Sequence, residues 1–406
     1  MIDNKQLKVV VCGGGQTGHL AVALFSHFAH VKASLLTQNP ITVERHQQQN
    51  QKLSVHYHDG KVIDYSIELI TNLPQIVIPH ADIIILTVPS HQQANWLNFI
   101  SPYLSTSHTV FIGAIPGING FDWLAEQFFK DKPNVVIWGM KDVPHIAWGL
   151  ELGTKVCFGG EKSELFIAFH HRENETNKNQ LHCWLSEIYS APITILDNYL
   201  EITLTPANPI MHSSVIYGLI GPYAQWHQRN FESPLCWWND CPELGAYYLQ
   251  RCDEERLAIC QYLTKELAIS LNTVKPLIEE LREAYTEQIE DAKTLWSILR
   301  SNKAYHGIQL PLINAEGGGW VFNKNHRVFQ EDIIYGLCLL VNLGKHLNIP
   351  IPYMQEIYTW CMDYLGLKPE IHHPIFTKID LTQYRVAKRW NCLKTIWLLG
   401  SYSVFK

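Results

Sequence analysis

The chain has 406 residues, of which 47% are hydrophobic and 17% are charged, and its formal net charge is −6. This length predicts about two domains, or three, and the acidic balance argues against a protein that binds duplex nucleic acid. No apolar run reaches the roughly 20 residues that a membrane-spanning helix needs. The first predicted strand starts too close to Met1 for a signal peptide to precede it. We therefore expect a cytoplasmic protein with no nucleic-acid or membrane partner.

The ten cysteines contain no C-x-x-C pair. Cys236 and Cys241 come nearest to a metal-binding spacing, but no second pair stands at ligand distance. We expect buried free thiols in a reducing compartment, and no metal site.

The first predicted elements follow one another in the order strand, glycine turn, helix and strand. Leu7 to Cys12 is a short apolar run typical of a strand buried on both faces of a parallel sheet. His19 to His30 has apolar residues at helical spacing, and Lys32 to Thr37 is a second strand. This order is that of the first half of a nucleotide-binding fold.

Strands and helices continue to alternate further along the chain. Helices are predicted at Gln92 to Leu104 and around Gly120 to Lys130. Further strands are predicted at Ala81 to Val88, Thr109 to Gly113, Asn134 to Trp138, Thr154 to Phe158 and Ser163 to Phe169. The alternation predicts an α/β domain of the Rossmann type, with a doubly wound parallel sheet.

Beyond about residue 200 strand-like runs become scarce, and apolar residues recur at the helical period. Helices are predicted at Glu254 to Leu271, Thr273 to Tyr285, Asp332 to Asn348 and Tyr353 to Leu365. We expect a dinucleotide-binding domain over residues 1–195 and a mostly α-helical substrate and catalytic domain over residues 196–406.

The tail from His372 to Lys406 has an excess of basic residues over its one acid, Asp380. The basic residues are Lys378, Arg385, Lys388, Arg389, Lys394 and Lys406. Its aromatic and aliphatic side chains predict docking on the body of the protein. The basic face could contact a second copy of the chain in a homodimer, but a solvated face is the interpretation that we favour.

The segment Gly13-Gly14-Gly15-Gln16-Thr17-Gly18 matches the pattern G-x-G-x-x-G. Gly13 permits a tight turn, Gly15 lets the backbone approach a pyrophosphate, and Gly18 lets the helix pack close to the strand. The N-terminus of the helix then offers free N–H groups and a positive dipole end to the phosphates. Because the pattern stands between a predicted strand and a predicted helix, it indicates a dinucleotide site that includes Gln16 and Thr17.

The residues after the second strand favour NADP over NAD. NAD enzymes usually place an acid there to bind the ribose hydroxyls. From His19 through Val43 the chain has no Asp or Glu, and the strand ends in Thr37, Gln38 and Asn39, with Arg45 nearby. Neutral polar groups beside a cation suit a 2′-phosphate, so we expect Thr37 and Gln38 to contact the cofactor.

Val88 and Pro89 follow another buried strand, at the carboxyl edge of the predicted sheet. Ligands collect at this edge in open α/β folds. We expect these two residues to line the cofactor, and the segment Ile115 to Gly117 to do the same after the next strand.

Two segments of the second half carry candidate catalytic residues. In the first, Asn208-Pro209-Ile-Met-His212, the asparagine and the histidine meet on one side of a helical turn if a helix starts at Pro209. In the second, Arg327 and Asp332 stand five apart ahead of Gly336-Leu337 and a long apolar helix, with Asp332 at its N-terminus.

The order N-P-x-x-H, then R-x(4)-D and G-L before a helix and a proline-bearing turn, resembles the octopine/nopaline/opine dehydrogenase family. The glycine-rich start and the helical second half agree with this resemblance over almost the whole chain. The resemblance implies an NAD(P)H-dependent reductive condensation, in which an amino acid and a 2-keto acid such as pyruvate form an imine that is reduced to a secondary amine. One departure is Ser213, which follows the histidine where many relatives have proline.

The residue types suit that chemistry. Arg327 offers a bidentate fork to a keto-acid carboxylate, and His212 can donate and accept protons near neutral pH. Asp332 can orient the imidazole and stabilise its cation. The resemblance assigns the same roles to these three residues, and makes Asn208 a nicotinamide or substrate contact.

Other interpretations of these residues stay open. Arg327 and Asp332 could form a structural ion pair, or Asp332 could cap a helix. Trp237 and Trp238, with Tyr247 and Tyr248, could form a wall of the amine pocket, although core packing is favoured. The segment Met140 to His145 could contact substrate or be a surface turn.

Two other functions compete with an opine dehydrogenase. A ketopantoate or 2-hydroxy-acid reductase usually has a catalytic lysine at the start of the second domain, but this chain has no lysine between Lys178 and Lys265. A dinucleotide-binding protein without turnover would leave the His–Arg–Asp set unexplained.

Overall fold

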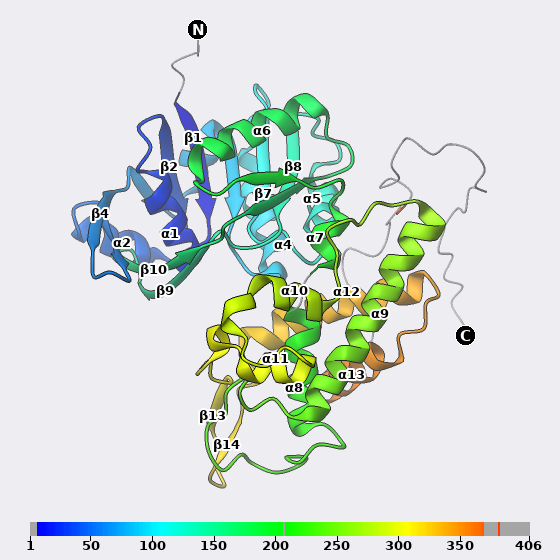
Figure 1. Ribbon diagram of the computed structural model, residues 1–406. Helices are drawn as coiled ribbons and strands as arrows, with labels where there is room; N and C mark the ends of the chain where they lie inside the picture. Colours follow the sequence, from blue (N-terminus) through cyan, green and yellow to red (C-terminus); the bar gives the residue numbers. More distant parts are fainter. Residues whose placement is uncertain (1–5, 206–207, 369–380, 382–406) are drawn as a thin grey trace.

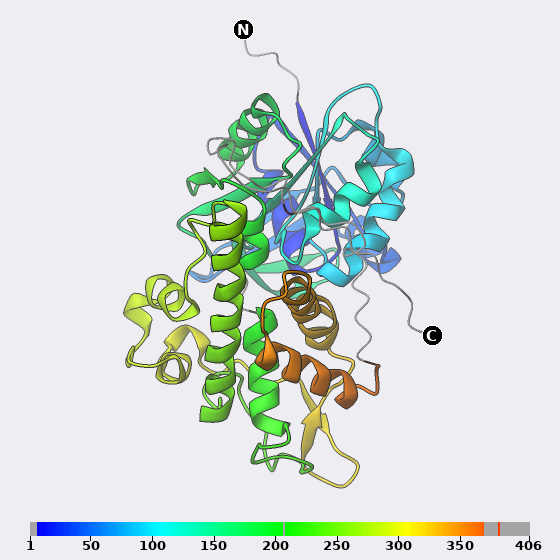
Figure 2. The ribbon, with the colours of Figure 1, turned by 90° about the vertical axis from the view of Figure 1, so that its right-hand side faces the viewer.

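The computed structural model describes residues 6–205, 208–368 and 381. The basic residues of the predicted tail lie outside this described part. A half built on a parallel sheet packs against a helical half, and the two views in Figures 1 and 2 show the same separation. The fold predicted from the sequence, a Rossmann-type domain followed by a mostly helical one, is confirmed.

The main sheet has eight strands within the described residues, in the order β12-β11-β8-β7-β6-β1-β2-β5. All neighbours are parallel except β11 and β8. The strands are β1 (Leu7–Cys12), β2 (Val31–Leu36), β5 (Leu69–Thr71), β6 (Ile83–Leu86), β7 (Val110–Ala114), β8 (Val135–Met140), β11 (Leu165–Phe169) and β12 (Ile193–Ile195). The central strands are apolar and buried on both faces, as a parallel sheet between helical layers requires.

Helices cover both faces of this sheet. The hydrophobic core on one face includes side chains of α1 (Gln16–Phe25) and α6 (Glu175–Ile188). The core on the other face includes α4 (Ser90–Ile100), α5 (Phe121–Phe129) and α7 (Leu200–Leu204), and continues into the helical half. The remaining helices of this half are α2 (Pro40–Gln48), α3 (Pro74–Val77), η1 (Ile78–His80) and η2 (Ser101–Tyr103).

A second sheet of four strands lies beside α1, in the order β4-β3-β10-β9 among the described residues. Its strands are β3 (Lys52–Tyr57), β4 (Val62–Ser66), β9 (His145–Glu151) and β10 (Lys155–Glu161). The predicted strand at Thr154 to Phe158 corresponds to β10, which belongs to this second sheet and not to the main one. This segment pairs in parallel with β3 and antiparallel with β9.

The helical half is arranged around α8 (Asn208–Ile220), which packs against α9 (Glu243–Leu267), α13 (Pro352–Tyr364) and η5 (Phe329–Leu337). A Cβ at Gly218 of α8 would overlap the backbone of Gly245 in α9, so glycine permits the close approach of these helices. The other elements are α10 (Leu277–Ala284), η3 (Thr286–Gln288), α11 (Leu295–Ser301), η4 (Lys303–Tyr305), the hairpin β13 (Leu312–Asn314) and β14 (Trp320–Phe322), and α12 (Cys338–His346). In the described part of the chain, no helix is both long and apolar enough to span a membrane.

Candidate active site

The glycine turn after β1 leaves room for a ligand in front of α1. Gly13 has a φ of 129°, and a Cβ at Gly18 would overlap the carbonyl oxygen of Gly13. Apart from its chain neighbours, no heavy atom of the described residues lies within 4 Å of the position that a Cβ at Gly15 would take. Glycine is thus required at positions 13 and 18 by the packing of the turn itself, whereas Gly15 borders an open space.

The first turn of α1 borders that open space and offers it backbone N–H groups. α1 begins at Gln16, and its N-cap, Gly15, has no side chain to cap it. The first N–H groups of a helix have no partner within the helix, and the helix dipole attracts anions to this end. Gln16 is exposed and Thr17 is half-buried. These residues therefore fit a pyrophosphate at the N-terminus of α1.

His19 connects this turn to the second sheet, a role that its position in a helix did not reveal. The N–H of Gly153 donates to His19 Nε2 at 3.0 Å, so Nδ1 carries the proton and donates to the Gly15 carbonyl at 2.9 Å. Burial is the main cause that lowers the pKa of His19 to about 4. The neutral ring therefore holds Gly15 against the loop between β9 and β10.

Neutral polar side chains follow β2 beside the glycine turn. Thr37 is buried, and a Cβ at Gly14 would overlap its hydroxyl group, so Thr37 packs behind the turn. Gln38 is exposed, and Asn39 caps α2 by accepting a hydrogen bond from the Ile41 N–H at 3.0 Å. Of the two residues predicted to contact the cofactor here, Gln38 is the accessible one.

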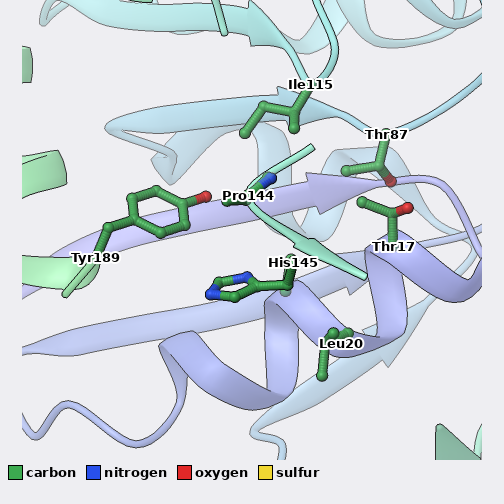
Figure 3. Close-up of a pocket in the computed structure, with 8 residues that line it drawn as sticks. Thr17, Leu20, Thr87, Ile115, Pro144, His145 and Tyr189 are labelled. Carbon is green, nitrogen blue, oxygen red and sulfur yellow. The ribbon is translucent and has the colours of Figure 1, made fainter. Parts of the chain in front are cut away.

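The ends of β6 and β7 line a small pocket beside α1, shown in Figure 3. Its lining residues are Thr17, Leu20, Ala21, Thr87, Ile115, Pro144, His145 and Tyr189. Val88 and Pro89 follow Thr87 at the same edge, and a Cβ at Gly13 would lie 2.9 Å from the Val88 side chain. The structure thus brings Val88 next to the glycine turn, and Pro89 to the N-cap of α4.

His212 and Asp332 form a hydrogen-bonded pair in the helical half. His212 is on α8 and Asp332 on η5, and Nδ1 lies 2.8 Å from Asp332 Oδ2. The two side chains are 18% and 7% exposed. Because the carboxylate accepts this hydrogen bond, Nδ1 carries a proton and Nε2 is left to exchange one with a substrate.

The expectation that Asp332 stands at the N-terminus of an α-helix needs correction. η5 begins at Phe329 and is a π-helical segment that runs directly into α12. Asp332 accepts the hydrogen bond of His212 instead of capping a helix end. π-Helical turns are rare and occur frequently at functional sites.

Two tryptophans pack against the His212 ring. The ring centroids of Trp237 and Trp238 lie 4.5 Å and 5.6 Å from that of His212, and both side chains are buried. The two tryptophans are therefore packed in the core, as the sequence favours, and through the same packing they cover one side of the His212 ring. Tyr247 and Tyr248 contact Tyr353 instead.

Arg327 is near enough to this pair that its charge and those of His212 and Asp332 all act on His326. Its side chain is 72% exposed, and its Nη1 lies 3.6 Å from Glu331 Oε2. Burial raises the pKa of Glu331, while a hydrogen bond from the backbone of Ser90 and the charge of Arg327 act against this rise. The long ion pair and the high exposure leave the guanidinium accessible to a carboxylate from solution. Asn208, the first residue of α8, is also exposed.

Two histidines that the sequence analysis did not single out share this region. Burial lowers the pKa of both His91 and His326, and the charge of Arg327 lowers each of them further. The negative charge of Asp332 acts in the opposite direction on both. His91 belongs to α4 of the Rossmann-type half and His326 precedes η5 of the helical half. The candidate site thus lies where the two halves meet.

Ser213, the residue after His212, lies within α8. Its hydroxyl donates to the Pro209 carbonyl at 2.5 Å, one helical turn earlier. The departure from the proline of many relatives therefore leaves the helix, and the place of His212 on it, intact.

The fold and the candidate site together define a class of protein. A dinucleotide-binding Rossmann-type fold faces a histidine–carboxylate pair and an exposed guanidinium from a helical domain. That combination is typical of nicotinamide-dependent oxidoreductases that act on small carboxylate-bearing substrates.

Comparisons with known proteins identify the family. The model of the NAD/NADP octopine/nopaline dehydrogenase α-helical domain matches residues 195–365. An uncharacterised protein of Sinorhizobium fredii is 44% identical over 89% of this chain and 95% of its own length. An opine dehydrogenase of Haliotis discus hannai is 26% identical over 89% of this chain and 91% of its own. A solved octopine dehydrogenase with NADH and L-arginine has a TM-score of 0.77 at 23% identity, covering 89% of this chain and 90% of that one. The chain belongs to the octopine/nopaline/opine dehydrogenase family of NAD(P)-dependent oxidoreductases, as the motifs predicted.

Proposed function

We propose that this protein is an opine dehydrogenase, which condenses an amino acid with a 2-keto acid such as pyruvate and reduces the resulting imine. The observation that carries the proposal is the His212–Asp332 hydrogen bond beside an accessible Arg327, at the junction with the dinucleotide-binding half. Solved octopine dehydrogenases of the same fold hold NADH together with L-arginine or with pyruvate.

In this proposal His212 moves the protons of both steps. His212 in its imidazolium form donates a proton from Nε2 to the carbonyl oxygen as the amine nitrogen attacks the keto carbon, and Nε2 then takes a proton from that nitrogen. A second donation from Nε2 breaks the C–O bond, so that the oxygen leaves as water and a protonated imine remains. A reduced nicotinamide bound at the glycine turn would supply a hydride to the carbon of this protonated imine, and the nitrogen would keep the one proton left from the amine. Asp332 stabilises the imidazolium form through Nδ1–H, and Trp237 and Trp238 keep bulk water from one side of the ring.

Arg327 binds the keto-acid carboxylate in this scheme. Its planar guanidinium can donate two parallel hydrogen bonds to a carboxylate, which fixes the plane of the keto acid as well as its position. Asn208, exposed at the start of α8, is placed to contact the nicotinamide or the substrate.

A second part of the proposal is a preference for NADPH over NADH. Solved relatives hold NADH or NADP⁺. The exposed Gln38 and the absence of an acid after β2 support the phosphorylated form. Gln38→Asp should weaken NADPH binding by about tenfold or more through charge repulsion and favour NADH, as titrations of both cofactors would measure. Wild-type protein that binds NADH at least as tightly as NADPH would contradict this preference.

A substrate panel tests the proposed reaction. NADPH oxidation would be followed with pyruvate alone and with pyruvate plus each of a set of amino acids, and the product identified by mass spectrometry. An opine dehydrogenase requires both substrates and gives a product with the summed mass of the two, less one oxygen. Turnover with pyruvate alone would instead indicate a 2-hydroxy-acid reductase, and NADPH binding without any turnover would indicate a binding protein.

A further inference from the structure

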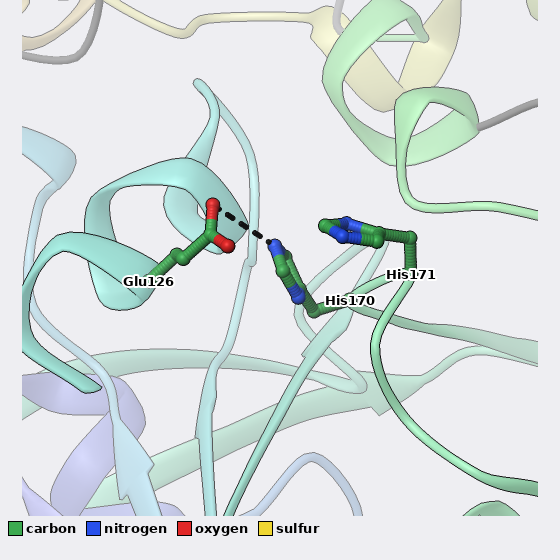
Figure 4. Close-up of side chains that lie close together, drawn as sticks. All are labelled: Glu126, His170 and His171. Carbon is green, nitrogen blue, oxygen red and sulfur yellow. Dashed lines mark ion pairs between the residues drawn. The ribbon is translucent and has the colours of Figure 1, made fainter. Parts of the chain in front are cut away.

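A buried histidine away from the candidate active site has an imidazole ring for which the described residues provide no hydrogen bond. The side chain of His170 is 0% exposed, and neither of its ring nitrogens makes a hydrogen bond to a described residue. Its Nε2 lies 3.4 Å from Glu126 Oε2, the ion pair drawn dashed in Figure 4. Buried polar groups are rarely left in this state unless a water or an ion occupies the space beside them.

A second histidine completes a set of metal-ligand types at this place. The rings of His170 and His171 have centroids 4.0 Å apart, and one ligand atom from each of Glu126, His170 and His171 lies within 4.8 Å of the other two. Figure 4 shows Glu126 on α5 facing the two rings at the end of β11. Two imidazoles and one carboxylate are a donor set that Zn²⁺ takes in proteins, with a fourth position left to water.

The charges around the site leave room for a cation. With neutral imidazoles, the carboxylates of Glu126 and Glu173 and the guanidinium of Arg172 together contribute a charge of −1 to this region. Arg172 is held 3.0 Å from Glu173 Oε1 and donates to the carbonyls of Phe129 and Val135. Its positive charge is thereby partly neutralised before a metal arrives.

The geometry requires only a small contraction to bind a metal ion. Ligand atoms around a tetrahedral Zn²⁺ with bonds of about 2.1 Å are about 3.4 Å apart. Glu126 is partly exposed and His171 is exposed, so these two side chains can move toward the fixed, buried His170. We propose that Glu126, His170 and His171 form a binding site for Zn²⁺ or a similar divalent transition-metal ion.

The place of this site in the fold indicates a structural role. β11 runs antiparallel to β8, and the His170 N–H bonds the carbonyl of Ile137 in the first half of β8. The site therefore lies toward the amino ends of the parallel strands, whereas the glycine turn lies at their carboxyl ends. A bound ion would fasten α5 to the connection between β11 and α6 without touching the substrates. The expectation of no metal site came from cysteine spacing, which carries no information on this set.

Zinc binding to the full-length protein tests the proposal without using activity. Protein stripped with a chelator and dialysed would be titrated with ZnSO₄ by calorimetry, and its metal content measured after gel filtration. His171→Ala and Glu126→Gln should each lower the affinity of one zinc site by about 100-fold or more, because each removes one of three ligands. His30→Ala is the matched control, since His30 also lies 3.4 Å from a glutamate, Glu187, but no third metal-ligand residue joins this pair among the described residues.

Thermal stability provides the second measurement. Zn²⁺ should raise the melting temperature of the wild type and of His30→Ala, and leave those of His171→Ala and Glu126→Gln nearly unchanged. Because Glu126 and His171 are at least partly exposed, the stripped variants should melt close to the stripped wild type, which checks that they fold. Equal zinc affinity and equal zinc-induced stabilisation in wild type and His171→Ala would overturn the proposal and leave a water as the partner of His170.

Discussion

The hydrogen bond between His212 and Asp332 allows the roles of the two residues to be separated. His212→Ala should lower turnover by roughly 100-fold or more, the usual scale for the loss of a positioned proton-transfer group. NADPH affinity should change little, because the phosphates are assigned to the glycine turn of the other half. Asp332→Asn should cause a smaller loss and shift the pH–rate profile toward lower pH, since an amide does not stabilise the imidazolium. Turnover, NADPH affinity and melting temperature would be measured on the same samples, and near-normal turnover of folded His212→Ala would disprove the mechanism.

The exposed guanidinium of Arg327 makes a different prediction. Arg327→Lys keeps the positive charge and loses the two parallel hydrogen bonds, so the KM for the keto acid should rise by about tenfold or more. Cofactor affinity and melting temperature should stay near wild type, because the side chain is 72% exposed and its ion pair with Glu331 is long, at 3.6 Å. Steady-state kinetics with pyruvate varied at saturating amine would measure this. A loss of cofactor binding would instead assign Arg327 to the dinucleotide.

At the scale of secondary structure, the sequence predicts individual helices, strands and motifs, but not the contacts between segments that are far apart in the chain. The strand, glycine turn, helix and strand around Gly13 follow from adjacent residues, and so do the motifs that contain His212 and Asp332. The contact between those two residues spans 120 positions, and only the family resemblance pointed to it. The pairing of β3 with β10 and the nearness of His91 depend on the assembled fold. The π-helical form of η5 also has no signature in hydrophobic periodicity.

The hydrogen bonds of His19 give α1 a predictable response to acid. Burial lowers the pKa of His19 to about 4 in the folded chain, from 6.5. Between pH 6.5 and pH 4 the His19 imidazole binds a proton in the unfolded chain but stays neutral in the folded chain. The free energy of unfolding therefore decreases as the pH falls from 6.5 to 4. The shift corresponds to about 3 kcal/mol at most. His19→Gln should reduce this acid-induced loss in denaturant unfolding at several pH values, whereas His27→Gln, at an exposed position on the following turn, should not. Equal pH dependence of wild type and His19→Gln would contradict the assignment.

At the scale of the whole molecule, the proposed reaction needs groups from both halves in a fixed relation. The glycine turn belongs to one half and His212 to the other. Several contacts hold the halves together, among them the hydrogen bond from the Ser90 backbone to Glu331 and the ion pair between Lys141 and Glu280. Lys141 follows β8, in the segment Met140 to His145 that the sequence left open between a substrate contact and a surface turn, and Glu280 is on α10. The structure shows a contact between the two halves.

The Lys141–Glu280 pair should stabilise the junction in a pH-dependent manner. Its atoms are 3.2 Å apart, with side chains 12% and 26% exposed, and burial raises the pKa of Glu280 while Lys141 opposes that rise. A carboxyl whose pKa is raised on folding contributes stability below its unfolded pKa and loses it as pH rises through the folded pKa. Lys141→Met removes the opposing cation, so the free energy of unfolding should fall by about 1–3 kcal/mol, a range between those of exposed and buried ion pairs. The fall should be larger at pH 8 than at pH 5, because Glu280 is ionised at the higher pH. Adding Glu280→Gln should remove most of the difference between the two pH values.

Lys162→Met provides the matched control for this prediction. Lys162 lies 3.4 Å from Asp142, the neighbour of Lys141, but both side chains are about half exposed, at 48% and 47%. Exposed pairs contribute little, so this variant should stay within about 0.5 kcal/mol of the stability of the wild type at both pH values.

Because the cofactor turn and His212 lie on opposite sides of the junction, Lys141→Met should also lower turnover while NADPH affinity is kept. A stability loss that is equal at pH 5 and pH 8 would show that Lys141 acts through packing on Phe166, whose ring lies 5.5 Å from its Nζ, and not through the charge of Glu280.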